Sequence, residues 1–421
     1  MTAEAALGAA STMAIIGAGQ AGAEVATLLR QSRFEGRILL FGDEPYLPYQ
    51  RPPLSKAYLS GEIGADALIY KAAVAYEKAD VELRLGQRVS EIDRAAKRIL
   101  LDGGEPVAYD RLVLATGGRA RQLAVPGAEL RNIFYLRNIA DVQALQPELL
   151  SGRRLVIIGA GYVGLEVAAV AIKRRLAVTV LEAMPRVLAR VTAPELSAFY
   201  ERFHREAGVE IRTGVSVAGF APTQDGARVS EVLSGEGDAI AADLVLVGIG
   251  LVANTELAER AGLVVDGGIV VDDQSRTSDP EIYAIGDCAI HANHGFLRRK
   301  IRVESVPNAL EQARAAAASI MGKPCAPAAA PWFWSDQYDL KLQMVGLSDG
   351  YEKVVIRGAQ ESASFIAFYL KDGTIIAADA VNRPGDFMAA KRLVGERMSI
   401  AAESLADENI SLKTLMATGA R

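Results

Sequence analysis

Short apolar runs alternate along this chain with glycine turns and with stretches of helical length. Residues 13–16 (MAII), 37–41 (RILLF) and 177–181 (AVTVL) are such runs, and another opens the stretch 155–172. A short apolar run bounded by turn residues is typical of a strand buried on both faces. The stretches after the glycine turns favour helices, the first beginning near Gln20. The pattern therefore predicts strand–turn–helix units of an α/β fold.

Two of the glycine turns share the spacing Gly-x-Gly-x-x-Gly, at residues 14–24 (AIIGAGQAGAE) and 156–166 (VIIGAGYVGLE). The first glycine of such a turn permits the tight bend, the second lets the backbone approach a pyrophosphate, and the third lets helix and strand pack closely. The phosphates then rest at the positive end of the helix. The repeat predicts two bound dinucleotides. The glycines concerned are Gly17, Gly19, Gly22, Gly159, Gly161 and Gly164.

An acidic residue about 20 positions after such a turn binds a ribose hydroxyl. The next strand after the first turn leads to Asp43, with Glu44 as its nearest rival, and the one after the second turn leads to Glu182. A carboxylate accepts a hydrogen bond from a free 2′-hydroxyl and repels a 2′-phosphate, so the second site is expected to prefer NADH to NADPH. Arg186 and Arg190 could soften that preference. We expect a resident flavin and a visiting nicotinamide.

Composition and charge narrow the class of protein. The chain has 421 residues, 50% of them hydrophobic, so two or three domains are expected. A net charge of −5 gives no electrostatic reason to expect nucleic acid. The two cysteines, Cys288 and Cys325, suit a reducing cytoplasm and offer no dithiol for disulfide exchange. The histidines show no metal-ligand spacing, and His291 and His294 are expected to face solvent.

The stretch 155–172 is nearly as long as a membrane span and contains one charged residue, Glu166. Glycines interrupt it, and Glu166 would lie near the bilayer centre, where a carboxylate is unfavourable. We therefore expect a buried strand, a turn and a helix, and no membrane segment. Residues 1–12 lack the basic region of a secretory signal and are expected to be a frayed leader.

Further motifs point to a family. Residues 109–118 (YDRLVLATGG) and 277–289 (TSDPEIYAIGDCA) resemble two other signatures of the two-dinucleotide flavoprotein reductases. The stretches YQRPPLSKAYL, RVESVPNALEQAR, PWFWSDQYDLKLQMVGL and VNRPGDFMAAKRL resemble the NADH-dependent ferredoxin reductases of bacterial oxygenase systems, the putidaredoxin reductase-like FAD flavoproteins. The similarity runs over nearly the whole chain.

The resemblance implies two Rossmann-like dinucleotide-binding domains, one for FAD and one for NAD as in glutathione reductase, plus a smaller α+β C-terminal domain. The expected FAD domain comprises residues 1–115 and 245–325, the NADH domain residues 116–244, and the C-terminal interface domain residues 326–421. The Pro/Ala-rich stretch 323–331 is a predicted linker, after which short strands, a KDG turn and a helical segment follow.

The resemblance also implies the residues of both cofactor sites. Asp287 would bind the ribityl chain of FAD, Arg51 and Lys56 would face its pyrophosphate and the reactive edge of its ring, and Val306 would approach the ring through its backbone. The FAD set is Gly17, Gly19, Ala21, Gly22, Asp43, Arg51, Lys56, Val89, Ala115, Thr116, Arg137, Asp287, Glu304, Val306 and Trp334. The NAD set is Gly159, Gly161, Tyr162, Val163, Gly164, Glu166, Glu182 and Gly250.

Three of these residues are catalytic candidates. In the family, the residues matching Lys56 and Glu166 lie beside the ring nitrogen that accepts hydride, where a lysine can offset negative charge and a carboxylate can orient the lysine. The alternative is a glutamate that only complements its own helix N-terminus and a solvated lysine. Trp334 matches a tryptophan near the flavin and the docking surface, or it is simply a core residue, as we expect for Phe333.

A basic cluster bears on the expected protein partner. Arg298, Arg299, Lys300 and Arg302 form a basic cluster before the VESVPN motif. Such runs are usually solvated faces, but this one could steer an acidic ferredoxin toward the flavin.

The family's Gly-Ile-Gly loop continues to Pro-Asn, whereas Ala253 takes the proline position here. That loop is expected to be more mobile and to weaken nicotinamide binding.

The expected function is FAD-dependent electron transfer from NADH to a [2Fe–2S] ferredoxin that serves a cytochrome P450 or a ring-hydroxylating dioxygenase. A rubredoxin or nitrite-type reductase on the same scaffold is one alternative. A flavoprotein of binding or signalling type, resembling the apoptosis-inducing flavoproteins, is the alternative from another class.

Overall fold

The structure is a computed structural model that describes residues 7–418. The described chain divides into two compact units, each assembled from separate segments. The first unit holds the chain up to Gln50, Leu68–Arg119 and Val252–Pro331, and the second holds Arg51–Ala67, Ala120–Leu251 and the chain from Trp332 onward. Of the expected leader, residues 1–6 lie outside the described part, and Thr12 already opens the first strand.

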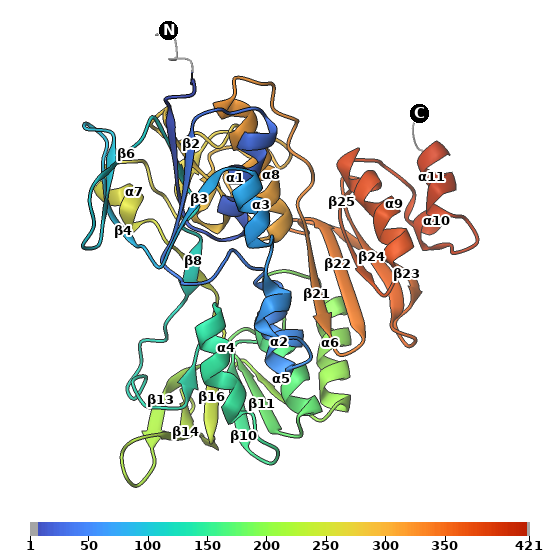
Figure 1. Cartoon of the computed structure of the whole chain (residues 1–421). Coiled ribbons are helices and arrows are strands. Elements are labelled where there is room, and N and C mark those ends of the chain that lie inside the picture. Colours follow the sequence, from blue (N-terminus) through green and yellow to red (C-terminus); the bar gives the residue numbers. More distant parts are fainter. Residues whose placement is uncertain (1–6, 419–421) are drawn as a thin grey trace. The chain divides into compact units, whose positions relative to one another are not determined.

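The first unit contains a parallel sheet with the strand order β3–β2–β1–β7–β19 (Figure 1). All neighbours in this order are parallel, and the order turns at β1, as in dinucleotide-binding folds. The apolar runs 13–16 and 37–41 form strands as predicted. The strands are β1 (Thr12–Ile16), β2 (Arg37–Gly42), β3 (Val81–Leu85), β7 (Arg111–Leu114) and β19 (Ile282–Ala284).

Both faces of this sheet are buried. Helices α1 (Gln20–Gln31) and α8 (Val306–Ile320) pack on one face and on each other, mostly through alanines, whose small side chains let the helices approach closely. The other face packs on a small antiparallel sheet and on α7. The remaining elements here are α3 (Ala73–Lys78), β4 (Val89–Asp93), β5 (Arg98–Leu101), β6 (Val107–Ala108), α7 (Glu256–Arg260), β18 (Ile269–Val271), η4 (Gly286–Cys288) and β20 (Ala289–His291).

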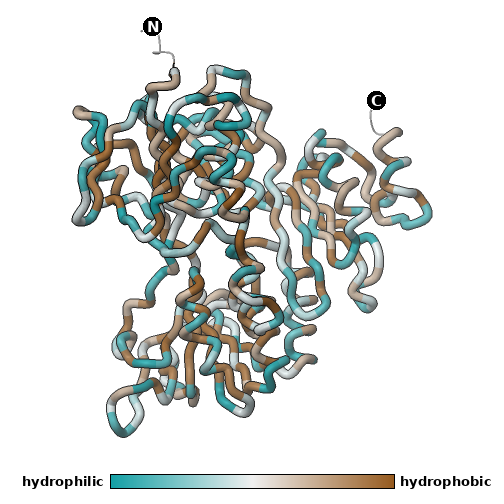
Figure 2. The backbone as a smooth tube through the Cα atoms, viewed as in Figure 1, coloured by the Kyte–Doolittle hydropathy of each residue, from teal (hydrophilic) through white to brown (hydrophobic). Residues whose placement is uncertain are grey.

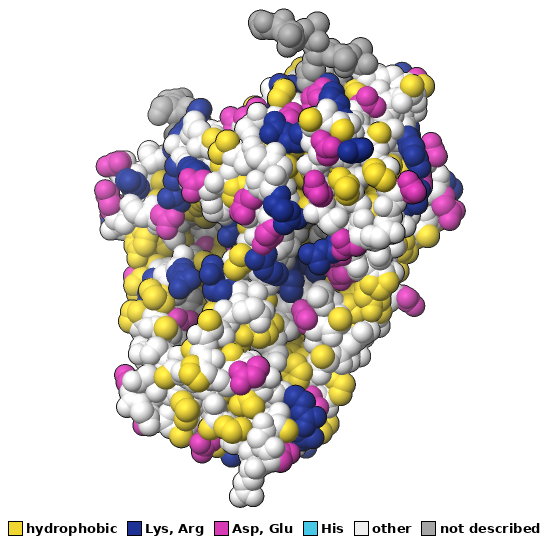
Figure 3. Space-filling model, turned by 90° about the vertical axis from the view of Figure 1, so that its left-hand side faces the viewer, with side chains coloured by type: hydrophobic (Ala, Val, Ile, Leu, Met, Phe, Trp, Pro, Cys, Tyr) yellow, Lys and Arg dark blue, Asp and Glu magenta, His cyan; other side chains and the backbone are white. Residues whose placement is uncertain are grey.

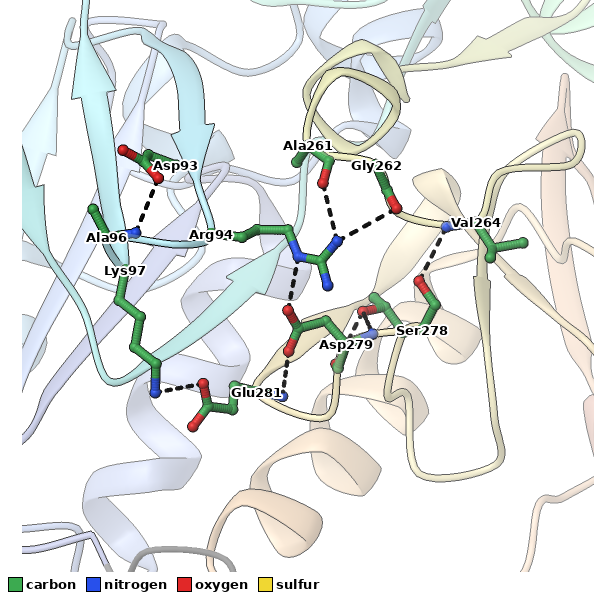
Figure 4. A network of polar contacts seen from close by, with 11 residues as sticks. Asp93, Arg94, Ala96, Lys97, Ala261, Gly262, Val264, Ser278, Asp279 and Glu281 are labelled. Carbon is green, nitrogen blue, oxygen red and sulfur yellow. Dashed lines mark hydrogen bonds and ion pairs between the residues drawn. The ribbon is translucent and has the colours of Figure 1, made fainter.

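A polar network ties the β4–β5 hairpin to the loop before β19 (Figure 4). Arg94 Nε donates to Asp279 over 2.8 Å, and its Nη1 donates to the carbonyl oxygen of Ala261 over 3.1 Å. Lys97 pairs with Glu281 in the same loop over 2.5 Å. The TSDPE part of the 277–289 motif therefore anchors the segment that leads through β19 to Asp287, a predicted FAD residue.

The second unit repeats the architecture. Its parallel sheet has the order β12–β11–β10–β16–β9, and its strands are largely apolar (Figure 2). Its strands are β9 (Ile133–Phe134), β10 (Arg154–Ile158), β11 (Ala177–Glu182), β12 (Glu210–Thr213) and β16 (Leu244–Val247). The helices are η1 (Pro52–Ser55), α2 (Ala57–Ser60), α4 (Ile139–Leu145), η3 (Gln146–Glu148), α5 (Tyr162–Lys173) and α6 (Pro194–Glu206). An antiparallel sheet contains β13 (Val217–Pro222), β14 (Val229–Ser234) and β15 (Ala239–Ala241).

The C-terminal part of the second unit is an antiparallel sheet with the order β21–β22–β25–β24–β23, followed by helices. The expected short strands, KDG turn and helical segment are all present. The strands are β21 (Trp332–Gln337), β22 (Leu340–Gly346), β23 (Lys353–Ala359), β24 (Ser364–Lys371) and β25 (Thr374–Val381), and the helices are α9 (Pro384–Gly395), α10 (Ala402–Ala406) and α11 (Leu412–Thr418).

Three short elements lie where the chain passes between units: η2 (Ala65–Leu68), β8 (Gly118–Ala120) and β17 (Leu251–Ala253).

The predicted strand, turn and helix at 155–172 are present as β10 and α5. Among residues 7–418, no helix is long and apolar enough to span a bilayer. Basic and acidic side chains intermingle over the face drawn in Figure 3.

A buried carboxyl group joins β25 to the loop before α6. Asp379 accepts hydrogen bonds from the hydroxyls of Tyr369, over 2.6 Å, and Thr192, over 2.8 Å. Burial raises the pKa of Asp379 to about 6, although both hydrogen bonds oppose the shift. Because this folded-state pKa lies above that of an unfolded aspartate, the stabilising contribution is complete below about pH 4 and is lost as pH rises through about 6.

Asp379→Asn is therefore expected to abolish a pH-dependent loss of stability, because an amide oxygen can accept both hydroxyls without ionising. The gain over the parent should reach about 3 kcal/mol near neutral pH and vanish in acid. Melting temperatures measured across this pH range test it, with Asp349→Asn, at an exposed position, as the control. Parallel curves for Asp379→Asn and the parent would contradict the prediction.

Candidate active site

The first glycine loop follows β1, and its three glycines have different surroundings. Gly17 has a φ of +114°, and a Cβ there would overlap the carbonyl oxygen of Ala115. A Cβ on Gly22 would overlap the carbonyl oxygen of Gly17. A Cβ on Gly19 would meet no described atom within 4 Å. The outer glycines are thus required by the protein's own packing, whereas the middle one borders open space that fits a pyrophosphate.

Helix α1 begins immediately after the open glycine. Its N-cap, Gly19, is extended, and within the described chain no side chain caps the helix and no acid lies in its first turn. The first amides of a helix lack partners inside it, and the helix dipole makes this end positive. The start of α1, where the predicted residue Ala21 is buried, therefore fits a phosphate group.

The two acidic candidates after β2 differ in their contacts. Glu44 Oε2 accepts a hydrogen bond from the Tyr49 hydroxyl over 2.6 Å. Asp43, the first residue after β2, is exposed. Of the two carboxylates, that of Asp43 is the more accessible to a ribose hydroxyl.

Three other predicted FAD residues of the first unit lie at one edge of its sheet. Ala115 and Thr116 follow β7 and Asp287 follows β19, at the carboxyl edge where parallel sheets bind ligands. Arg302 links two of the predicted residues, because it donates to the Asp287 carbonyl oxygen over 3.1 Å and pairs with Glu304 over 2.6 Å.

Two predicted residues complete this set. Val306 is the first residue of α8, after an N-cap serine whose hydroxyl accepts from the amide of Asn308. Val89 is buried at the start of β4.

The second glycine loop repeats these properties after β10. Gly159 has a φ of +101°, and a Cβ there would overlap the carbonyl oxygen of Gly248. A Cβ on Gly164 would overlap the carbonyl oxygen of Gly159, while one on Gly161 would meet no described atom within 4 Å. Helix α5 then starts without a described side-chain cap or an acid in its first turn. This loop fits a second pyrophosphate.

The acid of the second loop is held in place by backbone amides. Glu182 accepts from the amide of Ala160 over 2.7 Å, and from the amide of Met184 over 2.8 Å. Arg186, which could have softened a preference for NADH, donates instead to Ser197 Oγ over 2.5 Å and to the carbonyl oxygen of Ala189 over 3.0 Å. The carboxylate is therefore fixed at the carboxyl end of β11 while the nearer arginine is engaged elsewhere.

The remaining NAD candidates lie beside this loop. The Tyr162 hydroxyl lies 2.7 Å from Met344 Sδ, and its ring packs on Phe333 with centroids 5.1 Å apart. Val163 is 40% exposed in the first turn of α5. Gly250 is exposed with a φ of +107°.

Lys56 and Glu166 form a buried ion pair in the second unit. Lys56 Nζ lies 2.8 Å from Glu166 Oε2, and only 3% of the glutamate side chain and 19% of the lysine side chain are exposed. Ser55 donates to Glu166 Oε2 over 2.5 Å, and Ser335 donates to Oε1 over 2.6 Å. Lys56 Nζ also donates to the carbonyl oxygen of Pro52 over 3.1 Å. Both charges are thus paired and hydrogen-bonded, as burial requires.

The segment that carries Lys56 is anchored to neighbouring helices of its unit. Gln146 Nε2 donates to the carbonyl oxygen of Tyr58 over 3.1 Å, and Arg174 Nη2 donates to that of Ser60 over 3.0 Å. Arg51 donates to the carbonyl oxygen of Arg137 over 2.8 Å, so two predicted FAD residues lie together. These contacts limit the motion of Lys56.

The aromatic residues of β21 are all partly exposed. Trp334 packs against Trp332 with ring centroids 5.6 Å apart, and Lys391 Nζ lies 4.5 Å from the centre of the Trp332 ring. Phe333, expected in the core, is also partly exposed, although its ring packs on Tyr162. The three rings are therefore half-buried rather than part of the interior of the C-terminal sheet.

Comparison with known proteins places this geometry in a family. Residues 11–313 match the pyridine nucleotide-disulphide oxidoreductase family, and residues 332–416 match the reductase C-terminal family. The chain is 47% identical to putidaredoxin reductase CamA of Pseudomonas putida, over 98% of each chain. It is 44% identical to rhodocoxin reductase of Rhodococcus erythropolis, over 96% of this chain and 94% of that one.

The solved structures agree. The covalent putidaredoxin reductase–putidaredoxin complex contains a chain that superimposes with a TM-score of 0.95 at 47% identity, covering 98% of this chain and 99% of that one. The ferredoxin reductase for the CYP199A2 system from Rhodopseudomonas palustris superimposes with a TM-score of 0.93 at 42% identity, covering 97% and 100%. The chain belongs to the NADH-dependent ferredoxin reductases.

Membership in the ferredoxin reductases confirms the expected family, fold class and enzyme class, and the cofactors of this oxidoreductase are FAD and NAD(H). The two open glycine loops, with Asp43 and Glu182, fit these cofactors. The name of the larger family refers to disulphides, but both cysteines of this reductase are free thiols. Cys288 is buried, which raises its thiol pKa, and it contacts the carbonyl oxygens of Leu114 and Ile285.

Two expectations about the reductase sequence are wrong. His291 and His294 are 6% and 2% exposed, because His291 ends strand β20, the chain after it folds back to pair with it at Ile301, and the two rings pack edge to face. The expected loop at Ala253 is instead the short strand β17, while the weaker nicotinamide binding stays a prediction. The following Asn254 exchanges hydrogen bonds with Thr116, of 2.7 and 2.9 Å, which ties this segment to β7.

Sequence reasoning missed Ser55 and Ser335 as partners of Glu166. Ser55 directly precedes Lys56 in the PPLSK motif, and this position could have indicated that its hydroxyl lies near the ion pair. Ser335 lies 169 residues from Glu166, and nothing local indicates that they meet.

Proposed function

We propose that the chain passes electrons from NADH through FAD to a [2Fe–2S] ferredoxin, which in turn serves a cytochrome P450 or a ring-hydroxylating dioxygenase. The observation that carries the proposal is the repetition of one open glycine loop at the carboxyl edges of two parallel sheets, each with an acid at or directly after the end of the following strand. Two such sites let one protein hold two dinucleotides. Similar proteins include reductase components of dioxygenase systems.

The predicted residue sets for FAD and NAD are retained in this proposal. Bound FAD would supply the group that takes two electrons from NADH and releases them singly. Lys56, held by Glu166 and the Pro52 carbonyl oxygen, would present a fixed positive charge where negative charge develops. Glu182 would accept a ribose 2′-hydroxyl and repel a 2′-phosphate, which favours NADH.

Domain roles and location complete the proposal. We assign residues 1–115 and 245–325 to FAD binding, 116–244 to NADH binding and 326–421 to an interface domain. The match of residues 332–416 to the reductase C-terminal family supports the last assignment. The free thiols of Cys288 and Cys325 support a cytoplasmic location.

NADH-driven reduction of a panel of small electron carriers tests the function. The panel contains several [2Fe–2S] ferredoxins, including those encoded beside the gene, and a rubredoxin. Rapid reduction of a ferredoxin is the expected result. Faster reduction of rubredoxin would favour that alternative, and slow turnover with every carrier plus a long-lived complex of NAD with reduced flavin would favour a binding role.

The basic cluster makes a separate prediction about docking. Arg298, Arg299 and Lys300 are exposed, Lys300 pairs with Asp266, and Arg302 is turned toward Asp287 and Glu304. Exposed positive charge accelerates encounter with an acidic partner and is screened by salt.

Replacing both Arg298 and Arg299 with Glu should lower the rate of ferredoxin reduction by about tenfold at low salt and by less at high salt. NADH oxidation by a small neutral dye should stay at the parent rate. Equal loss of both activities would show that the pair is structural.

A further inference from the structure

A line of buried hydrogen bonds leads away from Glu166 inside the second unit. Ser335, which donates to Glu166, accepts from Gln337 Nε2 over 3.2 Å. Gln337 Oε1 lies 2.8 Å from His204 Nε2, and the Tyr338 hydroxyl lies 3.1 Å from His204 Nδ1. Ser335, Gln337 and His204 are at most 1% exposed. The line joins β21 to the last turn of α6 (Figure 1).

The chemistry of each group fixes the direction of these bonds. The carboxylate of Glu166 can only accept, so the Ser335 hydroxyl donates to it. That hydroxyl then accepts from the amide nitrogen of Gln337, which turns the amide oxygen toward His204. Because an amide oxygen cannot donate, His204 must carry its proton on Nε2, leaving Nδ1 to accept from Tyr338. Every donor in the line therefore points toward Glu166.

This direction requires a neutral imidazole, since a doubly protonated ring has no acceptor for the Tyr338 hydroxyl. Burial lowers the pKa of His204 to about 4, although its hydrogen bond with Gln337 opposes the shift. The ring is therefore neutral at physiological pH. Both ends of the Gln337 amide are also engaged, because its oxygen accepts from His204 and its nitrogen donates to Ser335.

We propose that Gln337 and His204 are positioning residues that hold Glu166, through Ser335, in the orientation in which it binds Lys56. Without Gln337, the Ser335 hydroxyl is free to rotate away from the carboxylate; without His204, the Gln337 amide is free to flip. Ser55 and Lys56 bind one carboxylate oxygen and Ser335 binds the other, so the line fixes the rotation of the carboxylate. The inference rests on the proposed function, in which this ion pair serves the redox reaction.

The first test measures the limiting rate of flavin reduction by NADH in the FAD-loaded protein. His204→Leu leaves the Gln337 oxygen unpaired and should lower this rate by about tenfold while the apparent Kd for NADH changes by less than about twofold. His204→Gln retains an amide donor for Gln337 and should stay within about threefold of the parent. Tyr200→Phe is the matched control, because this buried tyrosine of α6 has a hydroxyl without a partner among residues 7–418.

A double-mutant cycle then asks whether His204 acts through Glu166. In a Glu166→Gln background, His204→Leu should add less than about a further twofold loss, because the two residues act as one unit. A purely structural role for His204 would instead give losses that multiply. Multiplying losses, or no rescue by His204→Gln, would overturn the inference.

The second test needs no turnover. The chain has 3 histidines, so NMR of protein labelled at the histidine ring nitrogens resolves each ring, with His204→Gln as the assignment standard. His204 should show protonated Nε2 and bare Nδ1 and should remain neutral well below the pH at which a free histidine titrates. The opposite tautomer of His204, or titration of its ring like that of a free histidine, would overturn the inference even if His204→Leu fails to fold.

The proposed function and the inference about Gln337 and His204 can be overturned separately. A parent protein that shows no NADH-dependent flavin reduction overturns the proposed function and the inference with it. An active parent with the wrong His204 tautomer, or with multiplying losses in the cycle, overturns the inference alone.

Discussion

Glu166→Ala is expected to slow NADH-dependent reduction of the bound flavin by about a hundredfold, while FAD remains bound. The substitution leaves a mostly buried Lys56 ammonium with the Pro52 carbonyl oxygen as its one remaining partner among residues 7–418, and it removes the acceptor of the Ser55 and Ser335 hydroxyls. Breaking a buried ion pair costs about 3–5 kcal/mol, and a free lysine can turn toward solvent. Positive charge is then no longer held in one place.

Stopped-flow absorbance of the flavin measures this rate, and the FAD-to-protein ratio measures retention. Glu166→Gln separates charge from shape, because it removes the negative charge and keeps an acceptor for Ser335, while the Ser55 hydroxyl must accept from the new amide nitrogen instead of donating. Glu206→Gln is the control, since this glutamate is 69% exposed and pairs on the surface with Arg202. Flavin reduction at the parent rate in Glu166→Ala would refute the proposed role of the pair.

Gly161→Ala is expected to raise the KM for NADH by about tenfold or more without changing FAD content or melting temperature. A Cβ at this position meets no described atom within 4 Å, so the protein alone tolerates it. A methyl group would nevertheless occupy the space that the second loop leaves beside its backbone, where the pyrophosphate is expected. The loss should therefore appear only when the dinucleotide binds.

Two companion variants sharpen this result. Gly159→Ala would overlap the Gly248 carbonyl oxygen at a φ of +101°, so it should lower the melting temperature as well. Gly19→Ala is the matched variant of the first loop and should weaken FAD while sparing NADH binding. If Gly161→Ala and Gly19→Ala impaired the same cofactor, or neither, the assignment of one dinucleotide to each loop would be wrong.

The glycine loops could be predicted because their determinants are local. The bend at Gly17, the packing at Gly22 and the acid after the next strand all follow from residues within one strand–helix–strand unit. The apolar runs around them predicted β1, β2, β10 and β11 for the same reason. Spacing alone therefore located two sites and the helices that support them.

The surroundings of Glu166 could not be predicted in the same way. Ser335, Gln337 and His204 reach one another from β21 and α6, and no local pattern distinguishes them from ordinary polar residues. The error at His291 and His294 has a related cause, because nearby Gly and Asn indicated a loop but could not show what the loop packs against. Burial that depends on distant segments lies outside the reach of periodicity and spacing.

The assembly of the second unit from separate stretches restricts how such reductases can be recombined. Segment Arg51–Ala67 supplies Lys56, the stretch Ala120–Leu251 supplies Glu166, and the C-terminal stretch supplies Ser335. A chimera that exchanged the central Rossmann module alone would import a foreign glutamate and leave its lysine and serine with the host. A functional chimera should therefore need all three segments from one donor, or a donor and a host that already carry the same residues at all three positions.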